Sequence, residues 1–294
     1  MGPEVRGQIA SLGSGATVEH MRVPDAKRLM LRTPPLSLQR RIGGLLSAYD
    51  DLIEVNTRRI MNMEEMARRF FDEWFVKGRF PASDDASGRQ DLTEIHLRDL
   101  VEDVRDPVHP SEVSSDTTYV GLEHMPRRST TLLSVGRAGD VRSAKLRFHI
   151  GDILFGKIRP YFHKVVYAPF SGVTSSDSIV MRPKSTTLGF LALCHASSDE
   201  FVAHAVQTSN GTKMPRANWN VLQNYPVVLP PKRLLAQFVD MVGPATELCA
   251  KLAAMNVALG AARDFLLPKL ISGEIDLSGA EREIERASDR AAAE

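Results

Sequence analysis

The sequence predicts an α+β fold in which one mixed α/β domain is flanked by two long helices that pair as a coiled coil. Two stretches, within residues 36–80 and 232–275, repeat apolar residues every seven positions. Each stretch follows a Pro-Pro pair, at 34–35 and at 230–231. Between them lie short β-type runs separated by turn residues. A sustained seven-residue repeat marks a helix that buries a narrow stripe against a partner helix, and two such stripes can bury each other.

The first predicted helix spans residues 36–80 and contains two interleaved series. These series are Ile42, Tyr49, Asn56, Met63 and Phe70, and Leu46, Ile53, Ile60, Ala67 and Trp74. Roughly 40 residues at about 1.5 Å each give a rod on the order of 60 Å long, which suits a spacer. Gly78 and Pro81 are expected to end it. Asn56 is either a polar residue that fixes the register of the pair or an exposed residue.

The second predicted helix spans residues 232–275. Its series is Phe238, Ala245, Leu252, Leu259 and Leu266. Gly243-Pro244 is expected to bend or restart this helix, and Pro268 to end its regular part early. The segment that ends at Gly273 echoes the one that ends at Gly78. Each stripe alone also fits an ordinary core face, and the relative direction of the two helices stays open.

The repeat extends upstream of both helices. Gly15 aligns with Gly211, and Leu29 and Leu31 align with Tyr225 and Val227. We expect a strand before each Pro-Pro pair, because proline ends strand pairing, keeps its predecessor extended and suits a first helical turn. The second copy has a whole domain in front of it, whereas the first has not. Residues 1–35 are therefore interpreted as the tail of a truncated first domain.

The mixed α/β domain is predicted to occupy residues 92–231, after a polar linker at 81–91, and residues 276–294 form a polar tail. Residues 95–104 are typical of a short amphipathic helix, and residues 188–206 have helical periodicity. Strands are expected within 117–125, 145–158, 163–169 and 177–184.

Basic residues gather in one part of this domain. The segment between Gly121 and Val165 contains nine basic and three acidic residues, whereas the net charge of the whole chain is +1. The basic residues are Arg127, Arg128, Arg137, Arg142, Lys145, Arg147, Lys157, Arg159 and Lys164, with Tyr161 interleaved. Such a patch suits phosphate contacts, and arginine can also reach base edges. The alternative is a solvated face that acids elsewhere in the fold balance.

Several function classes lack their sequence signals. We find no glycine-rich cofactor turn, no Walker lysine motif and no catalytic tetrapeptide of an adenine methyltransferase, and the eight histidines have no ligand spacing. We therefore expect no catalytic site, no cofactor and no metal. The N-terminus lacks a signal-peptide core, no eighteen apolar residues run together, and the two cysteines, Cys194 and Cys249, are far apart. This pattern favours a cytoplasmic protein without membrane association.

The chain resembles the specificity subunits of type I restriction-modification systems. The resemblance lies in residues 34–75 for the central helix, in "YVGLEHM", "GDILFGKIRPYFHKVV" and "SSDSIVMRP" for a target-recognition domain, and in "LPPKRLLAQF…LLPKLISGEIDL" for the distal helix. It covers roughly residues 21–278. It implies a non-catalytic subunit whose recognition domains each read one half of a split DNA site, held apart by two helices that dock methyltransferase subunits.

The expected function is therefore DNA recognition by one domain, and the alternative is an assembly scaffold whose coiled coil binds partner subunits without recognising DNA. Expected partners are double-stranded DNA, methyltransferase subunits, the restriction subunit through the complex, and a second copy of the chain. Met66, Phe71 and Phe75 lie beyond the predicted seam, so they form either a second packing surface or a contact with the chain's own domain.

Site residues fall into two expected groups. Lys157, Arg159 and Lys164 are predicted to contact phosphate, with Arg142, Lys145 and Arg147 nearby. Sequence discrimination is expected from the loops between Arg127 and Arg142 and from Arg216 and Asn218 in the 215–220 loop. Trp219 of the same loop is more typical of a core residue.

Overall fold

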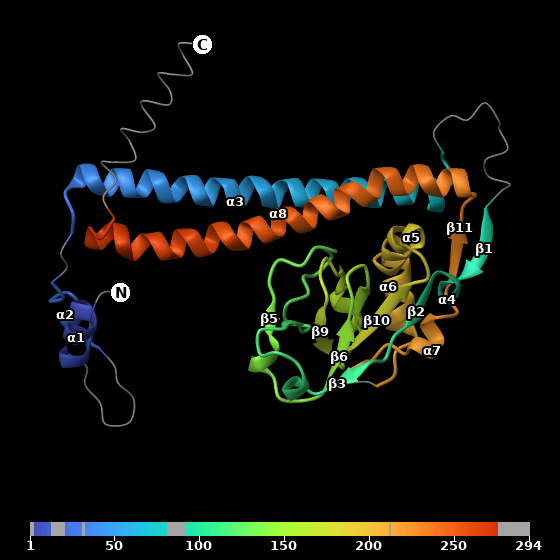
Figure 1. The fold of residues 1–294 in the computed structure, drawn as a ribbon, viewed down its shortest axis with the longest axis horizontal. Helices are drawn as coiled ribbons and strands as arrows, with labels where there is room; N and C mark the ends of the chain where they lie inside the picture. Colours follow the sequence, from blue (N-terminus) through green and yellow to red (C-terminus); the bar gives the residue numbers. More distant parts are fainter. Residues whose placement is uncertain (1–2, 13–20, 31–32, 81–91, 212, 276–294) are drawn as a thin grey trace, which may run out of the picture. The chain divides into compact units, whose positions relative to one another are not determined.

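We describe the protein from a computed structural model that covers residues 3–275 apart from 13–20, 31–32, 81–91 and 212. The predicted linker and polar tail lie outside these described residues. The chain forms two compact units, Met1–Glu54 with Ala258–Glu294, and Val55–Val257. Each long helix contributes to both units. The α+β fold with two long paired helices is confirmed (Figure 1).

The first unit begins with two helices, α1 (Pro3–Leu12) and α2 (Val23–Ala26). The Gln8 side chain ties them together, because its amide nitrogen donates to the Met30 carbonyl (3.0 Å) and its oxygen accepts from the Met30 N–H (2.8 Å). Residues 21–30 hold α2 and turns rather than a strand, and residues 31–32, on which the strand expected before the first Pro-Pro pair also falls, lie outside the described residues. Pro24 and Asp25 in the first turn of α2 favour helix there.

Two long helices, α3 (Leu36–Phe71) and α8 (Lys232–Ser272), run side by side in opposite directions (Figure 1). In the first unit Arg263 pairs with Asp50. In the second, Asn56 Nδ2 donates to Asn256 Oδ1 (2.9 Å). Asn56 is 5% exposed, so it is a buried polar residue of the seam rather than an exposed one.

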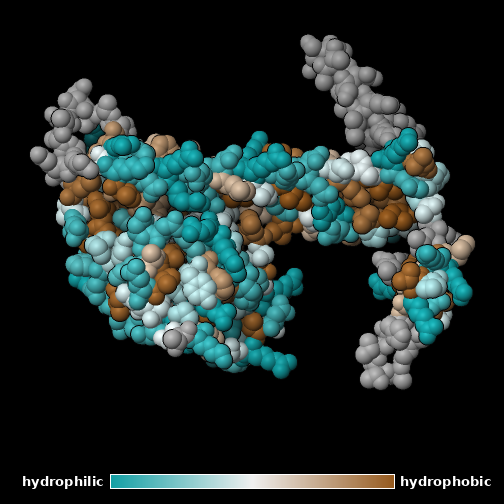
Figure 2. All heavy atoms as spheres, turned by 180° about the vertical axis from the view of Figure 1, so that it is seen from behind, coloured by the Kyte–Doolittle hydropathy of each residue, from teal (hydrophilic) through white to brown (hydrophobic). Residues whose placement is uncertain are grey.

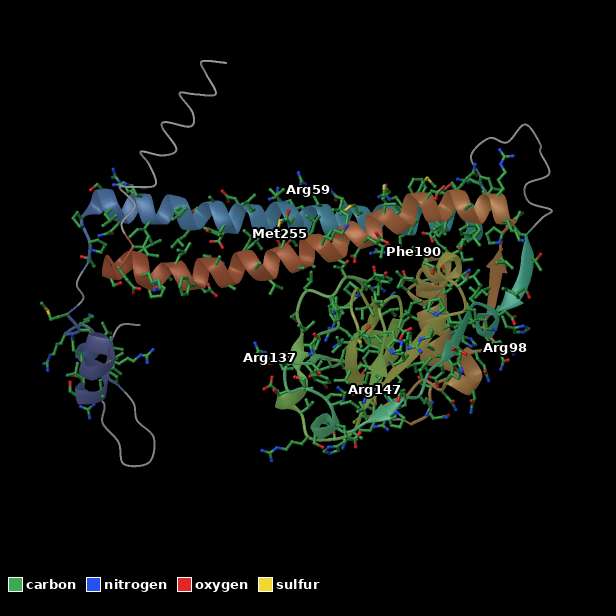
Figure 3. The ribbon with its side chains drawn as sticks, in the orientation of Figure 1. Arg59, Arg98, Arg137, Arg147, Phe190 and Met255 are labelled. Carbon is green, nitrogen blue, oxygen red and sulfur yellow. The ribbon has the colours of Figure 1, made fainter. Side chains whose placement is uncertain are left out.

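Helix α8 continues through both of its prolines, so neither a restart at Gly243-Pro244 nor an early end at Pro268 occurs. An interior proline costs a helix about 3 kcal/mol, and tertiary packing of the stripe compensates for it. Gly243 serves that packing: a Cβ there would lie 3.0 Å from Cε2 of Phe190, so the glycine lets α8 approach the domain closely (Figure 3).

Both helices close on a left-handed glycine, as their matching sequences predict. A π-helical turn, η1 (Asp72–Val76), follows α3, and Gly78 then adopts φ 65°. Gly273 follows α8 with φ 76°. Glycine reaches these angles without steric cost and so ends a helix cleanly.

The α/β domain contains three sheets. In a two-stranded sheet, β1 (Thr93–His96) pairs antiparallel with β11 (Pro226–Leu229), the strand predicted ahead of the second Pro-Pro pair. A four-stranded sheet has the order β2 (Val101–Asp103), β10 (Ser178–Pro183), β7 (Ile153–Gly156), β8 (Val165–Tyr167). A five-stranded sheet has the order β3 (Pro107–Val108), β6 (Lys145–Phe148), β9 (Gly172–Ser175), β4 (Thr118–Val120), β5 (Gly136–Arg137).

Helices cover the four-stranded sheet on the side of the long helix pair (Figure 1). They are α5 (Thr186–Ala196) and α6 (Asp199–Gln207), as predicted for residues 188–206; the short α7 (Trp219–Leu222) lies at the other end of the domain. The helix predicted over residues 95–104 is confined to α4 (Leu97–Leu100), because β1 and β2 take the flanking residues. Pairing with β11 and β10 supplies hydrogen bonds that override the local helical pattern.

The end of α3 is built into the domain core. Phe71 is 3% exposed and Phe75 is 6% exposed, and they pack with Leu97, Phe190 and Phe238 in one apolar cluster. The contact with the chain's own domain is therefore what these aromatic residues make, and the prediction of a second packing surface is wrong for Phe71 and Phe75. Met66 alone of the three remains exposed, at 38%.

Candidate nucleic-acid interface

Two segments predicted to meet DNA lie side by side. The Ala217 N–H donates to the Lys157 carbonyl, and the Arg159 N–H donates to the Pro215 carbonyl, both at 2.8 Å. Ile158 and Arg216 form an antiparallel bridge between them. The segment that follows β7 thus pairs with the 215–217 loop although nearly sixty residues separate them in sequence. Backbone pairing fixes the positions of the side chains on both segments.

A cleft of about 230 Å³ opens beside this pairing. Its polar lining residues are Arg105, Lys157, Asn210, Arg216 and Asn218, and Trp219 and Ile179 line its apolar part. Lys157, Arg216 and Asn218 were predicted from the sequence. Trp219 also packs against the main core, so the core interpretation and the interface interpretation both apply to it.

Arg105 and Asn210 were missed. Arg105 follows two acids and precedes a third in "EDVRDP", so a count of local charge hides it. Asn210 enters the cleft through its bridge with Arg216, which only the fold reveals. The one sequence signal that could have pointed to Asn210 is its closeness to Arg216 along the chain.

The two arginines of the cleft stay more than half exposed while they pair with acids. Arg216 lies 3.7 Å from Asp177, with 54% of its side chain exposed, and Arg105 pairs with Asp103 at 2.8 Å. The Lys157 ammonium donates to the Ser176 carbonyl (2.6 Å). Surface ion pairs of this kind are worth about 0–1 kcal/mol, so an incoming phosphate can compete with them.

The turn that follows Lys157 is held in an unusual backbone conformation. Arg159 and His163 have φ of 50° and 53°, on either side of a 3₁₀ turn at Pro160–Phe162. Such angles cost a non-glycine residue of order 1–3 kcal/mol and persist only where the surroundings impose them. The buried His163 ring does so through a 2.8 Å hydrogen bond to the Ser197 carbonyl, and burial lowers the pKa of this histidine.

This turn displays aromatic and basic groups together. Tyr161 is 51% exposed, and the Arg127 guanidinium lies 4.2 Å from the centroid of the Phe162 ring. The Arg159 Nε is buried and has no hydrogen-bond partner among the described residues. An arginine that a neighbouring ring orients, beside an exposed tyrosine, is suited to an anionic ligand.

Lys164, which was predicted to contact phosphate, and Lys145, which was predicted to lie nearby, instead face inward. Lys145 is 6% exposed, and its ammonium donates to the Ser143 carbonyl (2.9 Å) and hydroxyl (2.7 Å). The Lys164 ammonium donates to the Leu122 carbonyl. Burial lowers the pKa of both side chains. Neither ammonium is available to a phosphate in this conformation.

The remaining predicted residues lie apart from the cleft. Arg137 (β5) and Arg147 (β6) belong to the five-stranded sheet, where they pair with Asp116 (3.3 Å) and Asp106 (3.9 Å) (Figure 3). Arg142 is exposed in the loop between these strands. Arg128 pairs with Asp199 at 2.8 Å.

Among the described residues no cluster of histidine, cysteine or acidic side chains has metal-binding geometry. Burial raises the pKa of the Cys194 and Cys249 thiols to about 12 and about 11, so neither serves as a nucleophile near neutral pH. None of the helices in the described ranges combines the length and hydropathy that a bilayer span requires.

An apolar groove of about 770 Å³ lies between α8 and the loop after Thr131, where the back view shows hydrophobic side chains gathered (Figure 2). Leu133, Val135 and Ile150 line it from the domain, and Val257 lines it from α8. Each of these side chains is between 44% and 65% exposed.

Comparison with curated proteins finds two specificity subunits of type I restriction enzymes. The EcoDI subunit of Escherichia coli is 24% identical over 77% of this chain and 58% of its own length. The MjaIX subunit of Methanocaldococcus jannaschii is 20% identical over 91% of this chain and 65% of its own length. The chain thus spans about three fifths of the relatives that it matches. The resemblance expected from the residues is confirmed.

Comparison with solved structures gives the same fold. The type I restriction-modification S subunit of M. genitalium has a TM-score of 0.56 at 14% identity, covering 94% of this chain and 71% of that one. No family model matches the sequence.

Proposed function

We propose that this chain is a non-catalytic DNA-recognition subunit of a type I restriction-modification complex, with residues 92–231 as its recognition domain. The observation that carries the proposal is the pairing of residues 157–159 with 215–217, which gathers Lys157, Arg216 and Asn218 around one cleft. The relatives, which are specificity subunits, support the same assignment.

The groups of the interface divide by chemistry. Lys157, Arg105 and Arg159 suit phosphate oxygens, because their basic side chains are at least partly exposed. Arg216 and Asn218 can form paired hydrogen bonds with guanine and adenine edges, each worth about 1–3 kcal/mol of discrimination. The paired helices then act as a spacer that holds the domain at a set distance from a second one.

We further propose that the subunit directs methyltransferase and restriction subunits to a split DNA site. One recognition domain reads one half of such a site. A second copy of the chain can supply the other half, and two identical chains are expected to pair symmetrically.

The test is the salt dependence of binding to duplex DNA. Each lost phosphate contact should reduce the slope of log K against log salt by about 0.9. We expect Lys157→Ala and Arg159→Ala to reduce the slope in this way and Lys145→Ala, whose ammonium is buried, to leave it unchanged. A wild-type chain without salt-dependent binding, or three variants with the same slope, contradicts the proposal.

A second candidate is an assembly scaffold that binds partner subunits without recognising DNA, and the apolar groove beside α8 favours it. Light scattering of the chain mixed with its methyltransferase subunit, with and without duplex DNA, separates the two functions. Complex formation together with an absence of DNA binding supports the scaffold. DNA binding by the chain alone supports recognition.

A further inference from the structure

One carboxylate oxygen of Glu64, in α3, accepts several hydrogen bonds from the loop at residues 129–131. Its Oε1 accepts hydrogen bonds from Ser129 Oγ (2.9 Å), the Thr130 N–H (2.9 Å) and Thr131 Oγ1 (2.7 Å). Thr130 Oγ1 lies 3.2 Å from the same oxygen. Hydrogen bonds to an ionised acceptor are roughly twice as strong as neutral ones. This contact therefore joins the spacer helix to residues 129–131 firmly.

The same loop is held at a second point. Arg68, one turn further along α3, donates from Nη2 to the carbonyl of Arg128 (3.2 Å). The cavity that remains between α3, the loop and α8 has a volume of only about 30 Å³. Such a space holds about one water molecule, so the loop packs directly on the helix.

The other end of the loop belongs to the proposed interface. Arg127 lies on the Phe162 ring, next to the exposed Tyr161. Arg128 has φ 58°, a left-handed conformation that its surroundings must impose. Glu64 and Arg127 are thus connected through a short segment whose backbone is fixed on both sides.

We infer that Glu64 is a positioning residue, which sets Arg127 and the Tyr161–Phe162 turn in place relative to the spacer helix. Its effect on DNA rests on the proposed function, whereas the contact itself does not. Two roles of this carboxylate predict opposite results. If Glu64 acts only through its charge, its removal tightens DNA binding, because an acid near a cationic surface repels phosphate. If it positions the loop, its removal weakens the discrimination between sequences.

The experiment compares Glu64→Ala with Glu65→Ala in the full chain. Glu65→Ala is a matched control, because it removes the same charge from the same turn, and in the described part of the chain the ion pairs of Glu65 are with Arg68 and Arg69 rather than with residues 129–131. Hydrogen exchange of the Thr130 amide reports the contact directly. Affinity for a duplex that the wild-type chain enriches from a random pool, divided by affinity for a scrambled duplex, reports discrimination.

In Glu64→Ala we expect the Thr130 amide to exchange about tenfold faster. We also expect the affinity ratio to fall about tenfold, as for a lost base contact, with an unchanged salt slope. Glu64→Gln keeps an oxygen acceptor, so its Thr130 amide exchange and its affinity ratio should stay close to those of the wild-type chain. Should Glu64→Ala fail to fold, Ser129→Ala combined with Thr130→Val removes two donors from the loop side and is expected to give the same pattern.

Equal exchange in Glu64→Ala and Glu65→Ala overturns the inference. So does faster exchange with an unchanged affinity ratio, since the contact would then serve stability alone. A wild-type chain that does not bind duplex DNA contradicts the proposed function instead, and the exchange comparison still decides whether Glu64 holds the loop.

Discussion

Asp177 is an acid beside the cationic cleft, and it contacts two of the residues that line the cleft. Arg216 lies 3.7 Å from its carboxylate, and the Lys157 N–H donates to its backbone carbonyl (2.9 Å). Under the proposed function, a phosphate that enters the cleft meets this negative charge. We therefore expect Asp177 to limit DNA affinity while it orients Arg216.

Asp177→Asn is expected to tighten binding to a non-specific duplex roughly threefold at low salt, because it removes an exposed like charge. Fluorescence anisotropy with labelled duplex measures the change. Asp264→Asn is the control, since Asp264 is 70% exposed and lies on α8 outside the domain's unit. Equal effects of the two variants contradict the placement of the cleft at the interface.

His195 is a buried residue whose protonation opposes folding. It is 6% exposed, its ring packs 4.7 Å from that of Phe71, and burial lowers its pKa from 6.5 to about 4. Below pH 6.5 the unfolded chain binds a proton that the folded chain does not, so stability falls as pH decreases from about 6.5 to about 4. Above this window His195 is neutral in both states.

The free energy of unfolding should therefore drop by about 2 kcal/mol between pH 7 and pH 5 through this residue alone. In His195→Gln that part of the pH dependence should disappear. Urea titrations at the two pH values provide the measurement. Equal losses in wild type and variant would show that other groups account for the acid sensitivity.

At the level of the elements, Asn56 and Asn256 form a polar layer within the apolar seam of α3 and α8. Asn256 also donates to Thr57 Oγ1 (3.2 Å), so the amides satisfy each other and a neighbouring hydroxyl. A polar pair in a seam disfavours sliding by a heptad, because any other register leaves both amides against apolar groups.

Asn56→Leu alone should lower the free energy of unfolding by about 1–2 kcal/mol, since the Asn256 Oδ1 loses the hydrogen bond that Asn56 donates to it. Asn56→Leu with Asn256→Leu should recover that loss. A double-mutant cycle measured by urea unfolding gives the coupling energy directly. Strictly additive effects would mean that the pair does not act as one layer.

The seven-residue stripes predicted both helices and their pairing, because burial of a narrow stripe leaves a regular pattern. They could not predict an antiparallel arrangement, since a stripe reads the same in either direction. Pro268 misled the prediction of where α8 ends because local propensity is weaker than packing, and Leu270, which follows it, is 2% exposed.

The candidate site was predictable only in part, for a related reason. Charge in the sequence located Lys157 and Arg159, but it could not distinguish them from Lys145, whose ammonium turns inward to Ser143. Arg105 and Asn210 reach the cleft through strand and loop pairing between distant segments, and no local pattern encodes such a meeting.

For the molecule as a whole, the proposed recognition domain on its long helix pair is expected to recognise a single half-site. The chain matches 58% and 65% of the length of its two relatives. A chain with one such domain is expected to bind a short motif on its own and a split motif only when a second domain joins it.

Selection from a randomised duplex pool tests this account most directly. The full chain should enrich one short, contiguous motif, and a variant that carries Arg216→Ala and Asn218→Ala should lose the enrichment while it retains salt-dependent binding. If the wild-type chain binds the pool in a salt-dependent manner but enriches no motif, or does not bind it at all, DNA recognition by this domain is contradicted.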